Sequence, residues 1–391
     1  MRRFALLTAL ALTGLLAGSA DLSRPLVNDA YIWQRIWTPS LRAAMSESRD
    51  LVQSWRVLAA EADATGMFRL IKVDHQALGG TGKPAIAVFR IDGQLARWDE
   101  AVLLDGIAAT LADWKQAGTT PAGVEIDYDC ATARLGDYAQ FLFALRQRIS
   151  SRLSITALPT WLEARAFRDV LRPIDEVVLQ VHSVQSPEEG LFTGAEALDW
   201  ARRMGALTGK PFRLALADYG SRISLGQDGR IFSIESETPK LTGAAFGRDL
   251  TVDPREVAET VRTLERRPPG NLTGIVWFRL PTDADRRTWS LATWRAVIDG
   301  SSAQAKATIE LRASETAGLF YVTLANTERR DAVMPARIRV NGCEAADGAN
   351  GYGVERTADG WTFERAGGAI LKGQKNMVVG WARCIEGAHA S

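Results

Sequence analysis

The stretch Ala122-Gly123-Val124-Glu125-Ile126-Asp127-Tyr128-Asp129-Cys130 decides how the rest of the chain is interpreted. Side chains of a β-strand alternate between its two faces. The Val, Ile and Tyr of this stretch therefore share one face of a predicted strand, and Glu125, Asp127 and Asp129 share the other. Three carboxylates on one face repel each other and are costly to bury. We therefore expect such a row mainly where the carboxylates form ion pairs with cations or take part in catalysis. The alternative is an ordinary edge strand with a solvated polar face.

Strand-like segments alternate with helix-like segments on both sides of this stretch. The predicted strands are residues 30–34, 55–60, 85–91, 123–129, 153–158, 176–181, 212–217 and 274–279. The predicted helices are residues 41–54, 99–117, 135–149, 161–171, 194–207, 253–267 and 283–298. Eight strands that alternate with amphipathic helices predict an α/β fold, a parallel sheet closed into a (β/α)8 TIM barrel.

Two segments interrupt this alternation. Residues 68–73 are interpreted as a hairpin excursion, with no helix between them and the Gly-rich turn at 79–84. The alternative is that residues 68–73 are themselves the second strand of the barrel. Residues 223–225 and 231–234 are predicted to form a second hairpin within a long insertion after the seventh strand.

The chain divides into four predicted parts. Residues 1–20 carry Arg2 and Arg3, an apolar run and small residues, which is the pattern of a cleaved signal peptide. Residues 21–299 form the barrel, and residues 300–306 form a small, polar linker. Residues 307–391 contain short β-like runs between turn residues, which predict a small all-β, sandwich-like module.

The signal sequence predicts a periplasmic or secreted protein. Its apolar run is shorter than the ~20 residues of a membrane-spanning helix, so we expect no membrane span after cleavage. Ser19 stands where a bacterial lipoprotein would need its lipidated Cys, so no lipid anchor is predicted. An exported chain can form disulfides, and we expect Cys343 and Cys384 of the C-terminal module to pair, leaving Cys130 as a packed thiol. The alternative for the pair is two buried free thiols.

The composition narrows the possible partners and cofactors. The net charge is +1 with 24% charged residues and no basic block, so no nucleic-acid partner is predicted. The histidines are His75, His182 and His389. They are too few for a His-rich metal site. The Gly-rich turn fails as a phosphate loop because Ala77 replaces its first Gly and Pro84 follows Lys83. We therefore expect no metal and no cofactor; the sequence does not give the oligomeric state.

The active site of a TIM barrel lies at the carboxyl ends of its strands. Candidate substrate-binding residues at these ends are Glu61, Arg90, Gln180, His182, Asp218, Tyr219, Trp277, Arg279 and, near the same rim, Trp33. Flat aromatic surfaces among carboxylates and amides suit a sugar, whose C–H faces pack on rings while its hydroxyls form hydrogen bonds. Two interpretations of Trp277 stay open, the floor of a sugar subsite or barrel core. A lone His such as His182 is more often structural than catalytic.

Asp127 and Asp129 are the candidate catalytic pair. Two positions along one strand face separate their Cα atoms by roughly 6–7 Å. Close like charges raise the pKa of one carboxyl, which keeps it protonated as an acid while the other stays ionised. Paired carboxylates of this kind cleave glycosidic bonds. The alternative is a structural network in which Arg90 or Arg279 neutralises both acids.

The acidic strand resembles the Asp-Gly-x-Asp-x-Asp-x-Glu signature of family 18 glycoside hydrolases, which are chitinase-like. In the resemblance, Trp277 corresponds to the Trp that floors their sugar site, and the insertion after the seventh strand to their extra module. Three positions depart from the signature: Ala122 replaces its first Asp, Glu125 its second, and Asp129 its acidic Glu.

A closer resemblance is to the bacterial family catalogued as domain of unknown function 3142. It rests on the start Ala-Tyr-Ile-Trp-Gln-Arg at residues 30–35, on Ile-Asp-Tyr-Asp at 126–129 and on Ser-Ile-Thr-Ala-Leu-Pro-Thr-Trp at 154–161. Arg134, Leu135 and Tyr138 also match. The resemblance covers residues 29–298 and implies no activity.

Two functions follow as hypotheses. The first is an exported glycoside hydrolase-like protein that acts on a polysaccharide, with Asp129 as the acid and Asp127 as its electrostatic partner. The second is a non-catalytic carbohydrate-binding or envelope-assembly protein on a degenerate hydrolase barrel, which the missing Glu favours. Fold alone does not decide between them.

Overall fold

The computed structural model describes residues 25–95, 98–182, 190–225, 231–235, 246–285, 287–301, 305–365 and 368–390. The predicted signal peptide and the turn of the predicted second hairpin lie outside these residues. None of the helices in the described ranges is both long and apolar enough to cross a bilayer.

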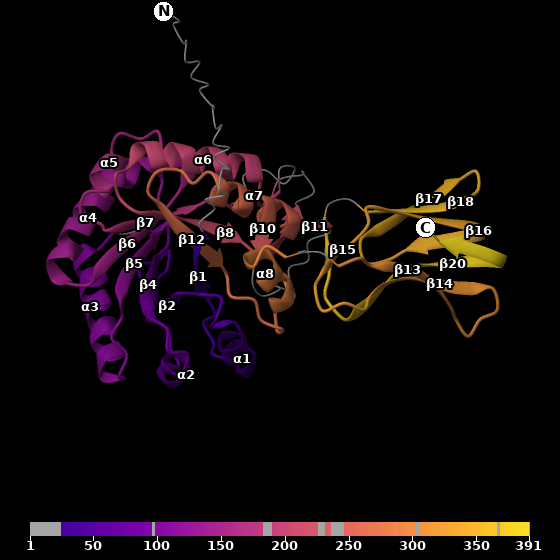
Figure 1. Cartoon of the computed structure of the whole chain (residues 1–391), viewed down its shortest axis with the longest axis horizontal. Coiled ribbons are helices and arrows are strands. Elements are labelled where there is room, and N and C mark those ends of the chain that lie inside the picture. Colours follow the sequence, from indigo (N-terminus) through magenta and orange to yellow (C-terminus); the bar gives the residue numbers. More distant parts are fainter. Residues whose placement is uncertain are drawn as a thin grey trace, which may run out of the picture.

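A closed ring of eight parallel strands forms the core of the described N-terminal part (Figure 1). The strands are β1 (Val27–Ile32), β2 (Trp55–Ala62), β4 (Ala85–Ile91), β5 (Gly123–Tyr128), β6 (Arg152–Ala157), β7 (Glu176–Gln180), β8 (Phe212–Ala217) and β12 (Leu272–Phe278). Neighbours in this order pair in parallel, and the ring closes because β1 pairs with both β2 and β12. The predicted TIM barrel is confirmed, and the acidic stretch supplies its fourth strand.

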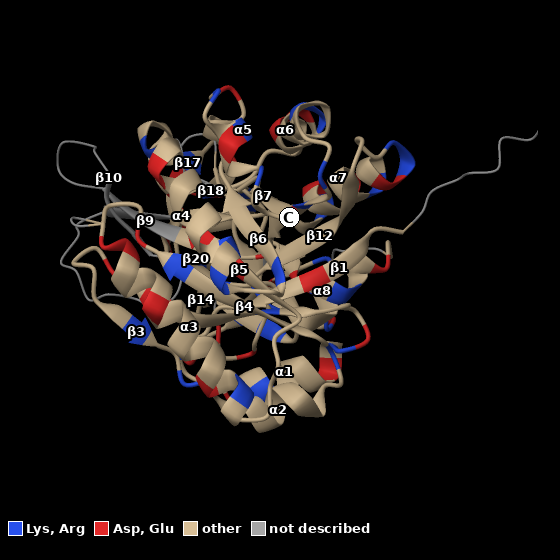
Figure 2. Ribbon diagram, turned by 90° about the vertical axis from the view of Figure 1, so that its left-hand side faces the viewer, with Lys and Arg blue, Asp and Glu red and all other residues tan. Residues whose placement is uncertain are grey.

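Helices surround the ring of strands, with acidic and basic residues interspersed on them (Figure 2). The α-helices are α1 (Pro39–Ser48), α2 (His75–Gly80), α3 (Glu100–Gln116), α4 (Leu135–Arg148), α5 (Phe167–Val170), α6 (Gly194–Leu207), α7 (Pro254–Arg266) and α8 (Leu291–Ile298), and the 3-10 turns are η1 (Thr132–Arg134) and η2 (Pro159–Trp161). Capping sets several starts: the backbone N–H of Leu41 donates to the Thr38 hydroxyl, and that of Val102 donates to Asp99.

Three helix predictions were wrong. The short helix α2 lies after β3 and takes in the first two glycines of the Gly-rich turn; Asp74 caps it by accepting from the backbone N–H of Ala77. Only η2 and the one-turn α5 occupy the predicted helix at 161–171. The last barrel helix begins at Leu291 rather than near residue 283, because Ser290 caps it through the N–H of Thr293 at 3.3 Å.

Strand alternation places the acidic stretch as the sequence predicts. The apolar residues Val124, Ile126 and Tyr128 are buried in the main core between strands and helices. The opposite face looks into the barrel, where Glu125 is fully buried and Asp127 is 7% exposed. The interior also holds a separate apolar cluster of Tyr31, Trp33, Leu58, Val88, Val178, Ala215 and Val276.

A buried ionic cluster fills the barrel below Asp127. The guanidinium of Arg56 is fully buried and contacts Glu125, Asp29 at 3.1 Å and Glu176 at 2.5 Å. The Tyr31 hydroxyl donates to the second oxygen of Glu125 at 2.5 Å. Glu125 is therefore neutralised inside the barrel and is separated from solvent.

Two excursions leave the barrel. The short strand β3 (Phe68–Leu70) pairs antiparallel with β2, which confirms the first predicted hairpin. After the seventh barrel strand, β9 (Gly220–Leu225), β10 (Ile231–Glu235) and β11 (Phe246–Thr251) form a small antiparallel sheet in the order β10-β9-β11.

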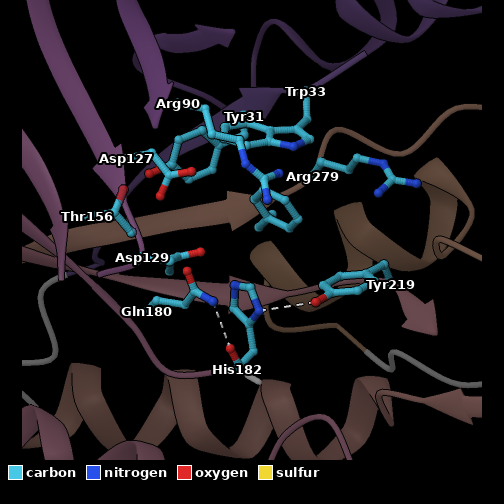
Figure 3. Close-up of a pocket in the computed structure, with 12 residues that line it drawn as sticks. Tyr31, Trp33, Arg90, Asp127, Asp129, Thr156, Gln180, His182, Tyr219 and Arg279 are labelled. Atoms are coloured by element: carbon cyan, nitrogen blue, oxygen red, sulfur yellow. Dashed lines mark hydrogen bonds between the residues drawn. The ribbon is translucent and has the colours of Figure 1, made fainter. Parts of the chain in front are cut away.

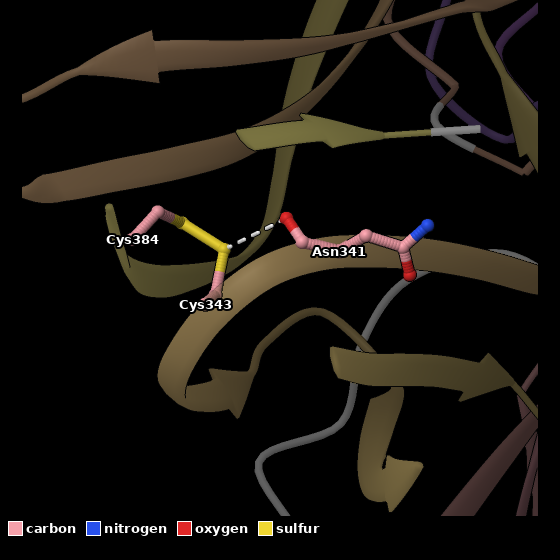
Figure 4. Close-up of a disulfide and its surroundings, with 3 residues drawn as sticks. All are labelled: Asn341, Cys343 and Cys384. Atoms are coloured by element: carbon pink, nitrogen blue, oxygen red, sulfur yellow. Dashed lines mark hydrogen bonds between the residues drawn. A yellow bond between two sulfur atoms is a disulfide. The ribbon is translucent and has the colours of Figure 1, made fainter. Parts of the chain in front are cut away.

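The C-terminal part is all-β, as predicted. A six-stranded antiparallel sheet consists, in order, of β13 (Thr308–Ala313), β14 (Leu319–Asn326), β20 (Lys375–Ala390), β16 (Arg337–Gly348), β18 (Gly360–Arg365) and β17 (Tyr352–Thr357). The short strands β15 (Ala332–Val333) and β19 (Ile370–Leu371) pair antiparallel with each other, and Leu371 of β19 lies in the core of the module. The sequence predicts strands of this module at residues 308–313, 319–325, 336–340, 361–364 and 377–381. These predictions miss β15, β17 and β19 and end too early for β16 and β20. A disulfide joins Cys343 of β16 to Cys384 of β20, with one sulfur 3.5 Å from the Asn341 carbonyl oxygen (Figure 4). Cys130 is a buried free thiol.

Polar contacts fasten this module to the barrel around the start of α8. Asp331, which is 2% exposed, accepts from the N–H of Ser290 at 2.6 Å, and its own N–H donates to the Thr293 hydroxyl at 2.7 Å. The ammonium of Lys372 donates to the Thr288 carbonyl oxygen. Burial lowers the pKa of Lys372, while nearby carboxylates oppose that shift.

Candidate active site at the barrel mouth

A cavity of about 190 Å³ opens at the carboxyl ends of the barrel strands (Figure 3). Its lining residues are Tyr31, Trp33, Arg90, Asp127, Asp129, Thr156, Gln180, His182, Ala215, Tyr219, Phe278 and Arg279. The structure thus brings together eight residues that the sequence proposed from six different strand ends.

The two candidate catalytic acids lie on one wall. Asp127 is the last inward residue of β5 and sits beside Arg90 of β4, its register partner. Asp129 follows the end of the strand and is more exposed. Gly93 lies against the Asp129 backbone so closely that an added Cβ would come within 2.0 Å of the Asp129 carbonyl oxygen. A glycine is therefore required at position 93 for this loop to approach the acid.

Both carboxyl groups hold protons more tightly than ordinary aspartates. Burial raises the pKa of Asp127 to about 8, with the charge of Asp129 adding to the shift and the guanidinium of Arg90 opposing it. Burial also raises the pKa of Asp129, again against Arg90. Because loss of hydration and like charge both favour the neutral form, the pair retains a proton near neutral pH.

The two cations in the lining differ in what they contact. The guanidinium of Arg90 lies over the ring of Trp33, 5.9 Å from its centroid, and its charge lowers the pKa of both acids. Arg279 is 3% exposed and forms an ion pair with Asp285. Arg279 is therefore held by an acid outside the candidate pair, and Arg90 is the cation that acts on the pair.

An aromatic wall faces the two acids. Phe278 occupies its centre, edge-to-face with Trp33 at 5.1 Å and Tyr219 at 5.6 Å, and stacked on His182 at 5.4 Å. Tyr31 packs against both Trp33 and Phe278 at 5.6 Å. Such a wall presents ring faces and edges to any ligand that reaches the carboxyl groups.

Polar groups line the remaining side. The Tyr219 hydroxyl lies 3.3 Å from Nδ1 of His182, and the Gln180 amide donates to the His182 carbonyl oxygen at 3.1 Å. Burial lowers the pKa of His182 to about 3, so the imidazole is neutral at physiological pH. Its Nε2 has no hydrogen-bond partner among the described atoms. His182 is thus a neutral polar group in the wall, unsuited to act as a cationic acid.

Three predicted residues do not line the cavity. Glu61 forms an ion pair with Arg35 at 2.6 Å. Asp218 is fully buried behind the wall, which raises its pKa well above the ordinary range. Trp277 points outward into the layer of helices, where its Nε1 donates to Asn28 at 2.8 Å. The interpretation of Trp277 as a sugar floor was therefore wrong, and the core interpretation holds.

Strand parity explains both the error and the residues that sequence reasoning missed. Val276 faces into the barrel, so Trp277 faces out and Phe278 faces in. The same rule would have found Tyr31, two positions before the proposed Trp33. Thr156 carries no such signal, because a single Thr near a strand end is common.

Fold and cavity define a class: a (β/α)8 barrel with a carboxylate pair and an aromatic wall at its mouth. The model of the family described as "Domain of unknown function (DUF3142)" matches residues 81–283, and the chain belongs to that family. A second model, "Domain of unknown function (DUF8456)", matches residues 309–385, within the C-terminal module. No curated protein matches the chain.

The chain is similar to solved structures of low sequence identity. The spore cortex-lytic enzyme SleL of Bacillus cereus is 14% identical with a TM-score of 0.50, over 72% of this chain and 75% of that one. A chitinase from Chromobacterium violaceum is 14% identical with a TM-score of 0.49, over 70% of this chain and 98% of that one. At such identities the likeness shows the fold alone.

Proposed function

We propose that this protein is an exported glycoside hydrolase that acts on a polysaccharide at the mouth of its barrel. The observation that carries the proposal is the pair Asp127 and Asp129, two carboxyl groups with raised pKa values opposite an aromatic wall. An acid that stays protonated near neutral pH is what cleavage of a glycosidic bond requires of a carboxyl group.

The proposed roles follow from position. Asp129, at the more exposed end of the pair, donates its proton to the glycosidic oxygen as the bond to the leaving sugar breaks. Asp127, deeper in the barrel, holds the proton that the pair retains at rest. As that proton passes to Asp129 and on to the glycosidic oxygen, Asp127 becomes ionised and stabilises the positive charge that develops at the anomeric carbon or on an attacking N-acetyl oxygen of the substrate. Water then attacks the anomeric carbon, and its proton restores the pair. Arg90 keeps one carboxyl of the pair ionised, because its charge opposes the rise in pKa of both acids.

The rest of the cavity supports a sugar as the ligand. Phe278, which is half-buried, offers apolar surface for the C–H face of a pyranose ring, and Trp33 packs against it in the wall. Gln180, Tyr219 and the unpartnered Nε2 of His182 offer hydrogen-bonding groups for hydroxyls. SleL, which resembles this chain in structure, is a spore cortex-lytic enzyme, and this also supports the proposal.

The second candidate is a barrel that binds glycan without cleaving it. Two observations favour it: Asp129 is one methylene shorter than the Glu of the family 18 signature, and Glu125 is committed to the buried cluster around Arg56. The proposal of export to the periplasm or beyond rests on the signal pattern of residues 1–20 alone.

The test is turnover and binding by the purified mature chain across chitin, peptidoglycan and other envelope glycans. We expect Asp127→Asn and Asp129→Asn to abolish turnover and to keep binding. Asp129→Glu separates the two candidates further: it raises the rate if reach limits catalysis and lowers it if the site is built around the shorter acid. Binding without turnover in every form would refute the hydrolase and support the glycan-binding barrel. Absence of both would refute both.

A further inference from the structure

A row of side chains crosses four neighbouring strands of the C-terminal sheet. Tyr321 of β14 pairs in register with Trp381 of β20, with Arg312 of β13 on one side and Asp347 of β16 on the other. The four strands lie side by side in the module (Figure 1). Directly paired residues of antiparallel strands project to the same face, so these side chains form one line of about 14 Å.

The aromatic part of this row is open to solvent. Tyr321 is 43% exposed, Trp381 is 37% exposed, and Val378, beside them on β20, is 40% exposed. Their strand neighbours Val322 and Ala382 are fully buried in the module core on the opposite face. The two rings therefore lie on the solvent-facing side of the sheet, and the module core lies on its other side. We call Tyr321, Val378 and Trp381 the aromatic platform.

Hydrogen-bonding groups frame the platform at both ends. Arg312 forms an exposed ion pair with Glu310 at 2.8 Å, and Asp347 is exposed at the other end. The amide of Asn350 donates to the Val378 carbonyl oxygen at 2.7 Å and lies at the same edge. The frame thus supplies guanidinium donors on one side and carboxylate and amide acceptors on the other.

The platform is too small for a stable protein interface. With roughly 150–250 Å² per aromatic residue, these exposed fractions leave about 60–100 Å² of each residue accessible. Tyr321 and Trp381 together offer at most ~200 Å², and the smaller Val378 adds less than either of them, against about 800 Å² on each partner in a stable complex. A narrow line of rings between polar ends instead fits a thin ligand with one apolar face.

We infer that the aromatic platform is a second glycan-binding site, on which consecutive sugar rings of a polysaccharide stack on Tyr321 and Trp381 while their hydroxyls bond to Arg312 and Asp347. A pyranose ring has an apolar C–H face and a polar rim, which matches the platform and its frame. The choice of a polysaccharide rests in part on the function proposed for the barrel mouth. The site holds the polymer near the barrel and takes no part in the reaction.

The experiment measures co-sedimentation of the full mature chain with chitin, peptidoglycan sacculi and cellulose, and turnover of a soluble chitooligosaccharide. Trp381→Ala and Tyr321→Ala should each weaken binding to at least one polymer by tenfold or more and leave turnover of the short substrate unchanged. Trp381→Phe, which keeps a ring, should retain most of the binding. Phe143→Ala is the matched control, since Phe143 is also 43% exposed but lies on α4 of the barrel.

The outcomes separate the platform from the barrel mouth. Loss of polymer binding in the platform variants supports the inference even if no glycan is cleaved by any form. Turnover with wild-type polymer binding in both platform variants overturns the inference and leaves the hydrolase intact. Absence of binding to all three polymers in the wild type also overturns it, as does a dimer in sedimentation velocity that Trp381→Ala disperses.

Discussion

Replacement of Asp127 by Asn should stabilise the protein, by an amount that grows as the pH rises. Burial raises the pKa of this carboxyl from 3.8 to about 8 in the folded barrel. Between these two values the unfolded chain has released the proton and the folded chain still holds it. The folded state then binds more protons than the unfolded state, so the free energy of unfolding falls as the pH rises through this window. The amide that replaces the carboxyl has no such proton to lose, so the variant escapes the penalty.

The size of the effect follows from the width of the window. A shift from 3.8 to about 8, at about 1.4 kcal/mol per unit, corresponds to a penalty on the order of 5 kcal/mol that is complete above pH 8. At about 2 °C per kcal/mol for a chain of this size, the Asp127→Asn protein should melt about 10 °C above the wild type at pH 8.5. Below pH 4 the two proteins should melt together, because the wild-type carboxyl is then neutral in both states.

The assay is thermal unfolding followed by circular dichroism from pH 4 to pH 8.5. Asp105→Asn is a suitable control, since its carboxylate is 73% exposed on α3. The control removes an exposed ion pair with Arg148 and should move little. Equal melting temperatures for Asp127→Asn and wild type at pH 8.5, or a gain that is the same at pH 4, would refute the argument that a buried proton on Asp127 destabilises the fold.

Three further predictions concern other charges and the disulfide. Arg90→Met removes the cation that lowers the pKa of both acids, so the alkaline limb of kcat/KM against pH should move up by about one unit; an unmoved limb would exclude this role. Arg56→Met leaves Glu125 and its neighbouring carboxylates buried without their cation. The free energy of unfolding measured in urea should therefore fall by about 3–5 kcal/mol, and Glu125→Gln should restore part of it. An unfolding midpoint equal to that of the wild type would contradict this. Cys343→Ser removes the disulfide that closes a loop of 41 residues. The loss of this cross-link should lower the free energy of unfolding of the C-terminal module by about 4 kcal/mol, through the chain entropy of its unfolded state. Limited proteolysis should then cleave the module faster, and reductant should have no further effect on this variant.

The sequence predicts most of the barrel because local patterns carry that information. The period-two alternation of residues 123–129 set the inward acids, and the predicted bounds of α6, residues 194–207, agree with the structure. Both features depend on burial of one face, which the order of apolar and polar residues records directly.

The parts that the sequence did not predict depend on contacts between distant residues or on a shift of one position. Nothing local indicates that Arg56 meets Asp29, Glu125 and Glu176, residues from four different strands, at one point. The end of the eighth strand offers Trp277 as one candidate for the cavity floor, because Trp277 is a large aromatic residue there. A shift of one residue gives that place to Phe278.

The hydrogen bond from Lys372 to the segment before α8 joins the C-terminal module to the barrel. The ammonium reaches the Thr288 carbonyl and lies within electrostatic range of Asp285, the partner of Arg279 in the cavity wall. Removal of the C-terminal module would therefore take a positive charge away from the acid that holds that wall in place. A shortened chain that ends before residue 305 is thus an altered active site as well as a missing sheet, and its failure to bind glycan would not by itself identify the part responsible.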